Sequence, residues 1–441
     1  MKNLVFMLMA IFGLANAAFA RQPLPLKVDS LFKLAEINSK TLDISRYKIE
    51  IAANATAVER QRINLPDIGA GFSYAYLSNA RVWDNRFNYD STVKMPHTSL
   101  DLSVDASYLV FDGSASKNQL AKARLKEQVA QLDFRKDKEE IQFLLLAKYL
   151  DLAALRNQEQ VFIENIALAE KRLTDIGKLV EQGMLTHNDE VRSELQLTEI
   201  RQQLTEIRNN STIVNHDLNT VLGLPQETVI EPDTALYSKG LQAGPLMRYR
   251  EGFTGRLPEL ELAGISSQLA EKQLHIQRSR GLPTVSLFAG DAVSRPFLYA
   301  MPPVDIYMHL LQTGIKVQYD IGSLYRNKRL VQQAKMEHTL AVKNEGLLAE
   351  KAEMAIHAAY IKLQDARQKF ASQQESYRLA RDNYRVVEQK YLNKFAVITD
   401  VVDASNALLA AQVNVNNARI GIIYQYYYLM KTSGFWDEVS H

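Results

Sequence analysis

The chain has 441 residues with 52 basic and 50 acidic side chains, a formal net charge of +2, and no cysteine. The lack of cysteine excludes disulfides, catalytic thiols and thiolate metal sites. The balanced charge argues against a nucleic-acid-binding surface, so no nucleic-acid partner is expected.

The segment at 1–20 predicts a secretory signal peptide. It reads MKNLVFMLMAIFGLANAAFA, with one lysine, an apolar run over 4–14, and small residues at Ala18 and Ala20. This pattern predicts cleavage after Ala20 and export of the mature chain. The apolar run is too short to cross a bilayer, and no later run reaches the roughly 18 apolar residues of a membrane-spanning helix. No cysteine follows the cleavage site to carry a lipid.

A first structural repeat is expected over 21–224, with β-strands at about 67–78 and 98–111. Between Leu100 and Val110, apolar side chains alternate with polar ones over the length of a membrane-spanning strand. Aromatic residues near the strand ends indicate an interfacial girdle, and a polar, aromatic loop separates the strands. For any single strand, a soluble antiparallel sheet with one hydrated face is the alternative.

Two long helices are expected next, at about 114–181 and 185–222. The stretch from His97 to Leu224 contains no proline and is rich in residues that favour helices. The first of these helices would extend on the order of 100 Å. We therefore expect it to pack lengthwise against other helices, as in a bundle or a coiled coil.

The second half of the chain repeats this pattern. INLPDIGAGFSY and SYLVFDGSASKN in the first half resemble RGLPTVSLFAGD and VQYDIGSLYRNK in the second. Asp189 corresponds to Asp400, and Gly223 corresponds to Gly434, with the same offset in residue number. This match predicts an internal duplication. An inter-repeat segment at 225–257 then leads into a second repeat at 258–441, with strands at about 284–293 and 309–320 and helices at about 323–392 and 399–431.

Four strands from one chain are too few to close a membrane barrel. In lipid every strand edge must be paired, because no water is present to satisfy the backbone. Three copies of the chain would supply twelve strands, an even number within the range of membrane barrels. The sequence therefore predicts that three chains together form one closed barrel.

Taken in this order and doubled, these features resemble the TolC family of outer-membrane efflux ducts over essentially the whole mature chain. The most specific parts are the paired Leu-Pro segments before the strands, the turns at 111–113 and 320–322, and the tip segments QGMLTHND and NKFAVITDVVDA. The resemblance implies a mixed α/β membrane protein, with a trimeric twelve-stranded transmembrane β-barrel continued by a twelve-helix periplasmic α-barrel. It places a homotrimer in outer-membrane lipid, extending into the periplasm.

The resemblance also implies an activity. The expected protein is the passive outer-membrane channel of a tripartite efflux system, which carries small molecules delivered by an inner-membrane pump and a periplasmic adaptor. It is not an enzyme and needs no cofactor. A type I protein-secretion or metal-efflux duct of the same family is the alternative. From another class, the alternative is a periplasmic coiled-coil adaptor or scaffold, although two duplicated strand pairs argue against it.

Asp400 and Asp403 match the family's acidic channel entrance, just past the second tip. Their spacing places them on one helix face, and three chains would form two rings of carboxylates that hold cations and repel anions. Alternatively, Thr399 or Asp400 caps the helix and Asp403 lies near its third residue, where it complements the helix dipole. The two roles can coexist. A metal site or a hydrolytic pair is disfavoured, because no histidine at ligand spacing and no nucleophile accompanies them.

Family members often close the entrance with links between a tyrosine, an arginine and an aspartate. Tyr391 and Asp189 stand at matching positions, but the arginine position holds Ala396, and Lys394 is a candidate substitute. The tips are also expected to contact the adaptor. The expected contact residues are Gly183, Met184 and Leu185 in the first tip and Phe395, Ala396 and Val397 in the second, where Lys394 replaces the usual glycine.

Two features concern the predicted barrel. Asp101 and Asp105 line its lumen and tune selectivity, or merely keep the lumen hydrated. Asp291 falls on the apolar face of the third strand. Either the register of that strand slips, or Asp291 lies at the rim of the membrane.

Two helical features are interpreted as structural. Glu353 and His357 have the spacing of a two-ligand metal clamp, but a solvated pair on the helix surface is favoured. The tyrosine-rich run at 424–428 resembles a ligand cage, but packing against neighbouring helices is favoured.

Overall fold

The computed structural model describes residues 23–233, 241–300 and 302–439, so the predicted signal peptide at 1–20 lies outside the described residues. The chain divides into two compact units. One comprises Met1–Ile44, Arg135–Pro258 and Glu350–His441, and the other comprises Ser45–Phe134 and Glu259–Ala349. We call them the hairpin unit and the sheet unit. Two long helices, α4 (Ala115–Glu181) and α8 (Ser323–Leu392), contribute to both.

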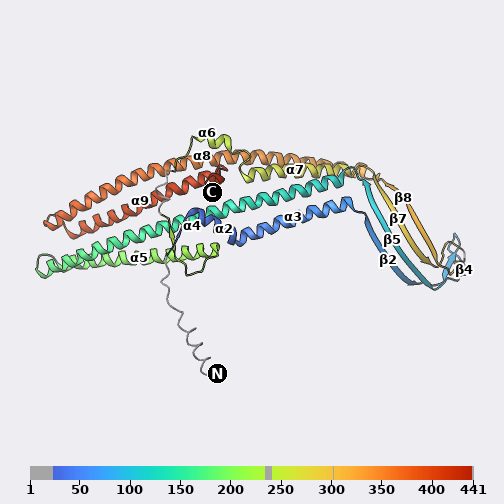
Figure 1. Ribbon diagram of the computed structural model, residues 1–441, viewed down its shortest axis with the longest axis horizontal. Helices are drawn as coiled ribbons and strands as arrows, with labels where there is room; N and C mark the ends of the chain where they lie inside the picture. The colour runs from blue at the N-terminus through green and yellow to red at the C-terminus, as the bar shows by residue number, and fades with distance from the viewer. Residues whose placement is uncertain (1–22, 234–240, 301, 440–441) are drawn as a thin grey trace, which may run out of the picture. The chain divides into compact units, whose positions relative to one another are not determined.

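The sheet unit contains one four-stranded antiparallel sheet (Figure 1). Its strands are β2 (Asp67–Tyr76), β5 (Thr98–Phe111), β7 (Thr284–Arg295) and β8 (Met308–Gln318), in the order β2-β5-β7-β8. The first residues of α4 and α8 follow β5 and β8. Helices α3 (Lys40–Asn64) and α7 (Pro258–Ser279) precede β2 and β7, so each repeat runs helix, strand, strand, helix. These two preceding helices were not expected from the sequence.

One face of the sheet is apolar and exposed. Val104 lies opposite Ala70 on one side and Asp291 on the other, and Asp291 lies opposite Leu311. The register does not slip at Asp291, which shares a face with apolar neighbours; the shift between β5 and β7 lies near the other end of β7, opposite Leu109 and Phe111. The Asp291 Oδ1 and His309 Nε2 atoms are 2.5 Å apart, so the carboxylate has a hydrogen-bonding partner on the same face.

The loop expected between the first two strands contains a short hairpin of its own. Strand β3 (Ala80–Trp83) pairs with β4 (Tyr89–Val93) in a separate two-stranded sheet. The Asp84 carboxylate accepts the backbone N–H groups of Arg86 and Asn88, both at 2.8 Å. These bonds hold the pKa of Asp84 below its usual range, with the Asn88 backbone contribution the largest. A local polar network thus orders a segment that carries no apolar alternation.

The hairpin unit is built from α2 (Val28–Asn38), α5 (His187–Leu222), α9 (Ile398–Thr432), and the parts of α4 and α8 within it. Short strands β1 (Leu24–Leu26) and β6 (Ile230–Pro232) pair in parallel. The main core surrounds Phe32, Tyr149 and Trp436, all nearly inaccessible to solvent. The tyrosine-rich run packs beside this core, because Tyr427 is buried and its ring lies 6.1 Å from that of Trp436. Tyr424 and Tyr428 stack at 6.3 Å.

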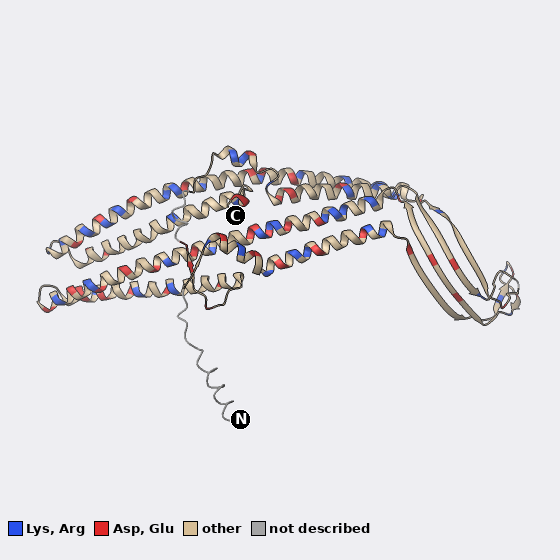
Figure 2. Ribbon diagram, viewed as in Figure 1, with Lys and Arg blue, Asp and Glu red and all other residues tan. Residues whose placement is uncertain are grey.

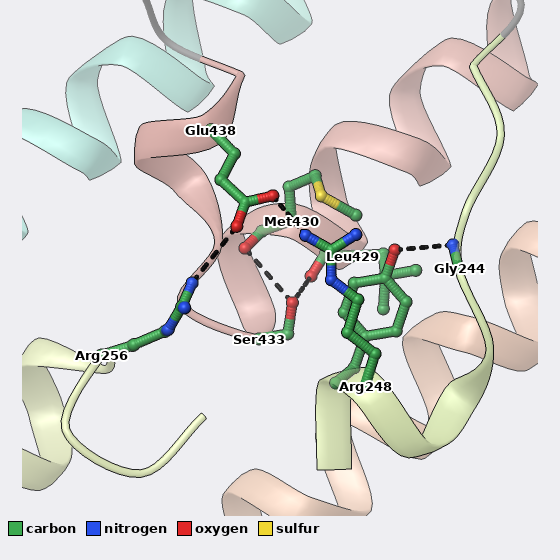
Figure 3. Close-up of polar contacts among 8 residues, drawn as sticks. Gly244, Arg248, Arg256, Leu429, Met430, Ser433 and Glu438 are labelled. Carbon is green, nitrogen blue, oxygen red and sulfur yellow. Dashed lines mark hydrogen bonds and ion pairs between the residues drawn. The ribbon is translucent and has the colours of Figure 1, made fainter. Parts of the chain in front are cut away.

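The inter-repeat segment is anchored to the end of the chain by two arginines (Figure 3). Helix α6 (Leu246–Gly252) carries Arg248, which pairs with Glu438 at 2.6 Å, and Arg256 pairs with the same carboxylate at 3.3 Å. Glu438 ends the short 3-10 helix η2 (Trp436–Glu438). Both guanidinium groups also lie over the Phe435 ring, at 5.1 and 4.1 Å. A charged and aromatic contact therefore joins the segment between the repeats to the last turn of the second repeat.

Charge is distributed differently along the two kinds of element. Figure 2 shows basic and acidic residues interspersed along the helices, whereas β2, β5, β7 and β8 carry few charges. Among the described residues, no helix combines the length and hydrophobicity that crossing a bilayer requires.

Candidate functional site

Two helical hairpins end in the same kind of turn. Between α4 and α5 the turn centres on Gly183 with φ +70°, and between α8 and α9 it centres on Lys394 with φ +64°. The Met184 N–H donates to Leu179 O at 2.8 Å, and the Phe395 N–H donates to Lys390 O at the same distance. Both helices therefore end in a Schellman-type motif with one left-handed residue. We call residues 181–189 the first tip and residues 392–400 the second tip.

A carboxylate stabilises the start of each returning helix. Asp189 Oδ2 accepts the Thr186 N–H at 3.0 Å and the Thr186 hydroxyl at 2.7 Å. Asp400 Oδ2 accepts the Val397 N–H at 3.1 Å. The helix α9 thus begins with Val397 as its N-cap and Asp400 as its third residue. The expectation that Thr399 or Asp400 is the N-cap, with Asp403 near the third residue, is wrong by two or three residues.

Asp403 lies one helical turn beyond Asp400, and both side chains are exposed. The geometry therefore assigns capping to Asp400 and not to Asp403. Both carboxylates are accessible for the entrance role expected from the sequence.

A small apolar cluster lies beneath both tips. Ile176, Ile398 and Val401 are buried there, and Leu185 packs against them. By contrast, Met184, Phe395 and Val397 have exposed fractions of 47%, 84% and 61%. Of the expected contact residues, these three and Gly183 face solvent, whereas Leu185 and Ala396 are half-buried.

Tyr391 lies in the same cluster without a hydrogen-bonding partner for its buried hydroxyl among the described residues. Burial and, to a smaller extent, the Asp189 carboxylate raise the pKa of Tyr391 to about 12, against the opposing effect of Arg172. Asp189 is therefore near enough to influence Tyr391. Its hydrogen bonds, however, go to Thr186, so the expected tyrosine–aspartate link is not a hydrogen bond within one chain.

Arg172 on α4 was missed from the sequence. Its Nη1 donates to Gln196 Oε1 of α5 at 3.0 Å. Its Nη2 donates to Tyr384 Oη of α8 at 3.0 Å and to Ser405 Oγ of α9 at 3.2 Å. The guanidinium carbon also lies 5.6 Å from the centre of the Tyr384 ring. One side chain therefore contacts the three other helices of the two hairpins.

Asp101 and Asp105 lie on the polar face of β5, opposite to the apolar face. Asp101 lies between Ser73 and Ser294 of the neighbouring strands. Asp105 lies between Gly69 and Gly290, and a Cβ at position 290 would be 3.0 Å from the Asp105 carboxylate. Small neighbours leave both carboxylates exposed on this face.

Glu353, which the sequence places in a solvated pair with His357, has another partner. The Glu353 carboxylate forms an ion pair with Arg250 of α6, so it serves the contact between the inter-repeat segment and α8.

Comparison with known proteins shows what the chain is similar to. No protein-family model matches the sequence. Outer membrane efflux protein BepC of Brucella suis biovar 1 (strain 1330) is 21% identical over 342 residues, which are 76% of this chain and 72% of that protein.

Two solved structures have a similar fold. The outer membrane protein VceC of Vibrio cholerae superposes with a TM-score of 0.74 at 15% identity, covering 92% of this chain and 96% of that chain. The outer-membrane channel OprN superposes with a TM-score of 0.76 at 14% identity, covering 92% and 89%. These likenesses confirm the fold that the sequence predicts.

Proposed function

We propose that this chain, which has the fold of the TolC family of outer-membrane efflux proteins, forms the outer-membrane channel of a tripartite efflux system. The channel is a passive export duct. It receives small molecules from an inner-membrane pump and a periplasmic adaptor and conducts them across the periplasm and the outer membrane.

The observation that carries this proposal is a sheet with two open edges. In the described residues, β2 pairs only with β5, and β8 pairs only with β7. The apolar face is exposed, with Phe72 at 68% and Ile315 at 68%. In lipid, unpaired edges are too costly to persist, and an exposed apolar face is favourable. Both properties are satisfied when three chains join edge to edge in a twelve-stranded barrel.

The long helices support the same assembly. Helices α4 and α8 have 67 and 70 residues, so each extends on the order of 100 Å. Each chain contributes two such hairpins, and three chains would enclose a tunnel in the periplasm. The polar faces of β5 and its neighbours then line the barrel, where Asp101 and Asp105 favour the passage of cations.

The tips form the periplasmic entrance of the channel in this proposal. Asp400 and Asp403 are exposed, and three copies would place two rings of carboxylates around the axis. Gly183, Met184, Phe395 and Val397 are exposed beside them and form the contact surface for the adaptor. The entrance opens when packed helices slide past one another, a change between two discrete packings.

The test has two parts. The full-length chain, expressed with its signal segment, should fractionate with the outer membrane and migrate in a heat-modifiable manner on gels. Purified protein should then conduct in planar bilayers. Replacing Asp400 and Asp403 by Asn should weaken cation preference and block by divalent cations. A protein that stays in the soluble periplasmic fraction would support the adaptor or scaffold alternative instead.

A further inference from the structure

A row of polar side chains joins the two hairpins. Gln158, Asn165 and Arg172 lie one heptad apart along α4, so they share a stripe of that helix. Gln158 Nε2 donates to Asn417 Oδ1 at 3.0 Å, and Asn165 Nδ2 donates to Gln412 Oε1 at 2.9 Å, both on α9. The contact of Arg172 with α9 ends the row near the tips. This stripe is polar where a coiled coil usually places apolar side chains.

Helix α5 adds two bonds to the same seam. Gln196 Nε2 donates to Asn406 Oδ1 at 2.9 Å, while the side-chain oxygen Oε1 of Gln196 accepts from Arg172. Arg192 Nη1 donates to Thr399 Oγ1 at 3.2 Å. Near the tips, the first hairpin therefore holds α9 by side-chain hydrogen bonds in addition to the small apolar cluster.

Such a seam can separate at modest cost. When the seam separates, hydrogen bonds between polar side chains are exchanged for bonds to water, so each bond contributes only modestly to the closed arrangement, whereas apolar contacts have no such replacement. Arg172 is the charged residue of the stripe on α4, and it donates to α5, α8 and α9. All three acceptors are neutral groups. The Nε of Arg172 is buried and has no hydrogen-bonding partner in the described part of the chain, so separation would let water satisfy that donor.

We propose that Arg172 holds the two hairpins of each chain together at the entrance and sets how readily the entrance opens. This inference rests on the proposed function, because it gives the regulation of the same entrance. Arg172 acts as a positioning residue. Its planar guanidinium reaches three helices at once, which the single ammonium group of a lysine cannot reproduce.

The test is the conductance of purified, full-length trimers in planar bilayers. Arg172→Ala should raise the mean conductance about tenfold, because two to three net hydrogen bonds are lost from the closed arrangement. Arg172→Lys keeps the charge but loses the planar fork of donors, so its conductance should be intermediate, about threefold above that of the unaltered protein. Arg201→Ala is the matched control, since Arg201 bonds Glu170 at 2.5 Å within the first hairpin and does not join the hairpins.

Two further variants cover the case in which Arg172→Ala fails to assemble. Tyr384→Phe and Ser405→Ala each remove one acceptor and keep the charge, so each should raise conductance about two- to threefold. Unchanged conductance in all the Arg172, Tyr384 and Ser405 variants would overturn the inference. The proposed channel function would still stand in that case, provided that the unaltered protein conducts. An equal rise in Arg201→Ala would also overturn the inference. Failure of the unaltered protein to conduct would instead count against the proposed function.

Discussion

The first and second tips form the same turn from different residues. The first has Gly183 in the left-handed position and Thr186 as the N-cap, whereas the second has Lys394 and Val397. The two tips share only the carboxylate at the third residue of the returning helix, which is Asp189 in the first tip and Asp400 in the second. A left-handed residue with a side chain costs about 1–2 kcal/mol, and an N-cap without a side-chain acceptor loses about 1 kcal/mol.

This difference shows that the backbone turn forms in the second tip without a glycine in the left-handed position and without a typical N-cap residue. The hydrogen bonds of the helix ends and the cluster below them hold the second tip in a conformation that its own residues disfavour. The second tip should therefore open locally more readily than the first, a property suited to the proposed role of the tips as a channel entrance.

The largest effect should come from the cluster that both tips share. Ile176→Ala and Ile398→Ala each empty a buried site, with exposed fractions of 1% and 2%, and should each cost about 2–5 kcal/mol. Chemical unfolding of the detergent-solubilised protein, followed by far-ultraviolet circular dichroism, measures this cost. Leu392→Ala is the control, because Leu392 is 60% exposed and its replacement should change stability by less than about 0.5 kcal/mol. A large loss in only one of the two isoleucine variants would show that the tips do not share the cluster.

Exchanging the left-handed residues should shift the two tips in opposite directions. Gly183→Lys should destabilise the first tip by about 1–2 kcal/mol, because a side chain is strained at positive φ. Lys394→Gly should stabilise the second tip by about 1 kcal/mol or less, since glycine also adds entropy to the unfolded chain. Hydrogen exchange of tip peptides, read by mass spectrometry, measures local opening. Shifts of the same sign in both variants would contradict the assignment of strain to Lys394.

The N-caps offer a smaller, matched exchange. Val397→Thr should add a hydroxyl that reaches Asp400 as Thr186 reaches Asp189, and should stabilise the second tip by about 1 kcal/mol. Thr186→Val should destabilise the first tip by a similar amount. The same hydrogen-exchange measurement applies. If Val397→Thr left exchange unchanged, Asp400 alone would account for the cap.

The smallest effect should be a pH dependence to which Tyr391 of the second tip contributes. Tyr391 has its pKa raised to about 12, mainly by burial, and the equivalent residue of the first tip is Val180. An unfolded tyrosine ionises near pH 10, so the contribution of Tyr391 to stability is fully present below about pH 10. It should decline as the pH rises from there to about 12. Tyr391→Phe should lessen this decline, to which the buried Tyr427, with its pKa also raised to about 12, contributes as well. Unfolding at pH 9 and pH 11 measures the decline, and an identical decline in both proteins would contradict the assignment.

Much of the fold follows from local patterns. Strand β5 occupies Thr98–Phe111, the same range that the alternation of apolar and polar residues predicts. The long helices begin and end within a few residues of their predicted bounds, because proline-free stretches and turn residues act locally. Helices α3 and α7 were not predicted, although each ends just before a strand that follows Pro66 or Pro283. Those prolines also mark where a helix has just ended.

The site was less predictable. Val397 is not a typical N-cap residue, so the start of α9 was placed too late, and Asp400 was given the wrong capping position. Arg172 acts through contacts with three helices that are distant in sequence, which no local pattern reveals. Its one sequence signal is the seven-residue spacing of Gln158, Asn165 and Arg172.

The account depends on the two open edges of the sheet, and the mass of the purified protein in detergent tests it most directly. Native mass spectrometry should give three chains in one particle, because three sheets must join to pair the edges of β2 and β8. A monomer that stays dispersed in water without detergent would contradict the account, since its apolar sheet face could not then be embedded in lipid.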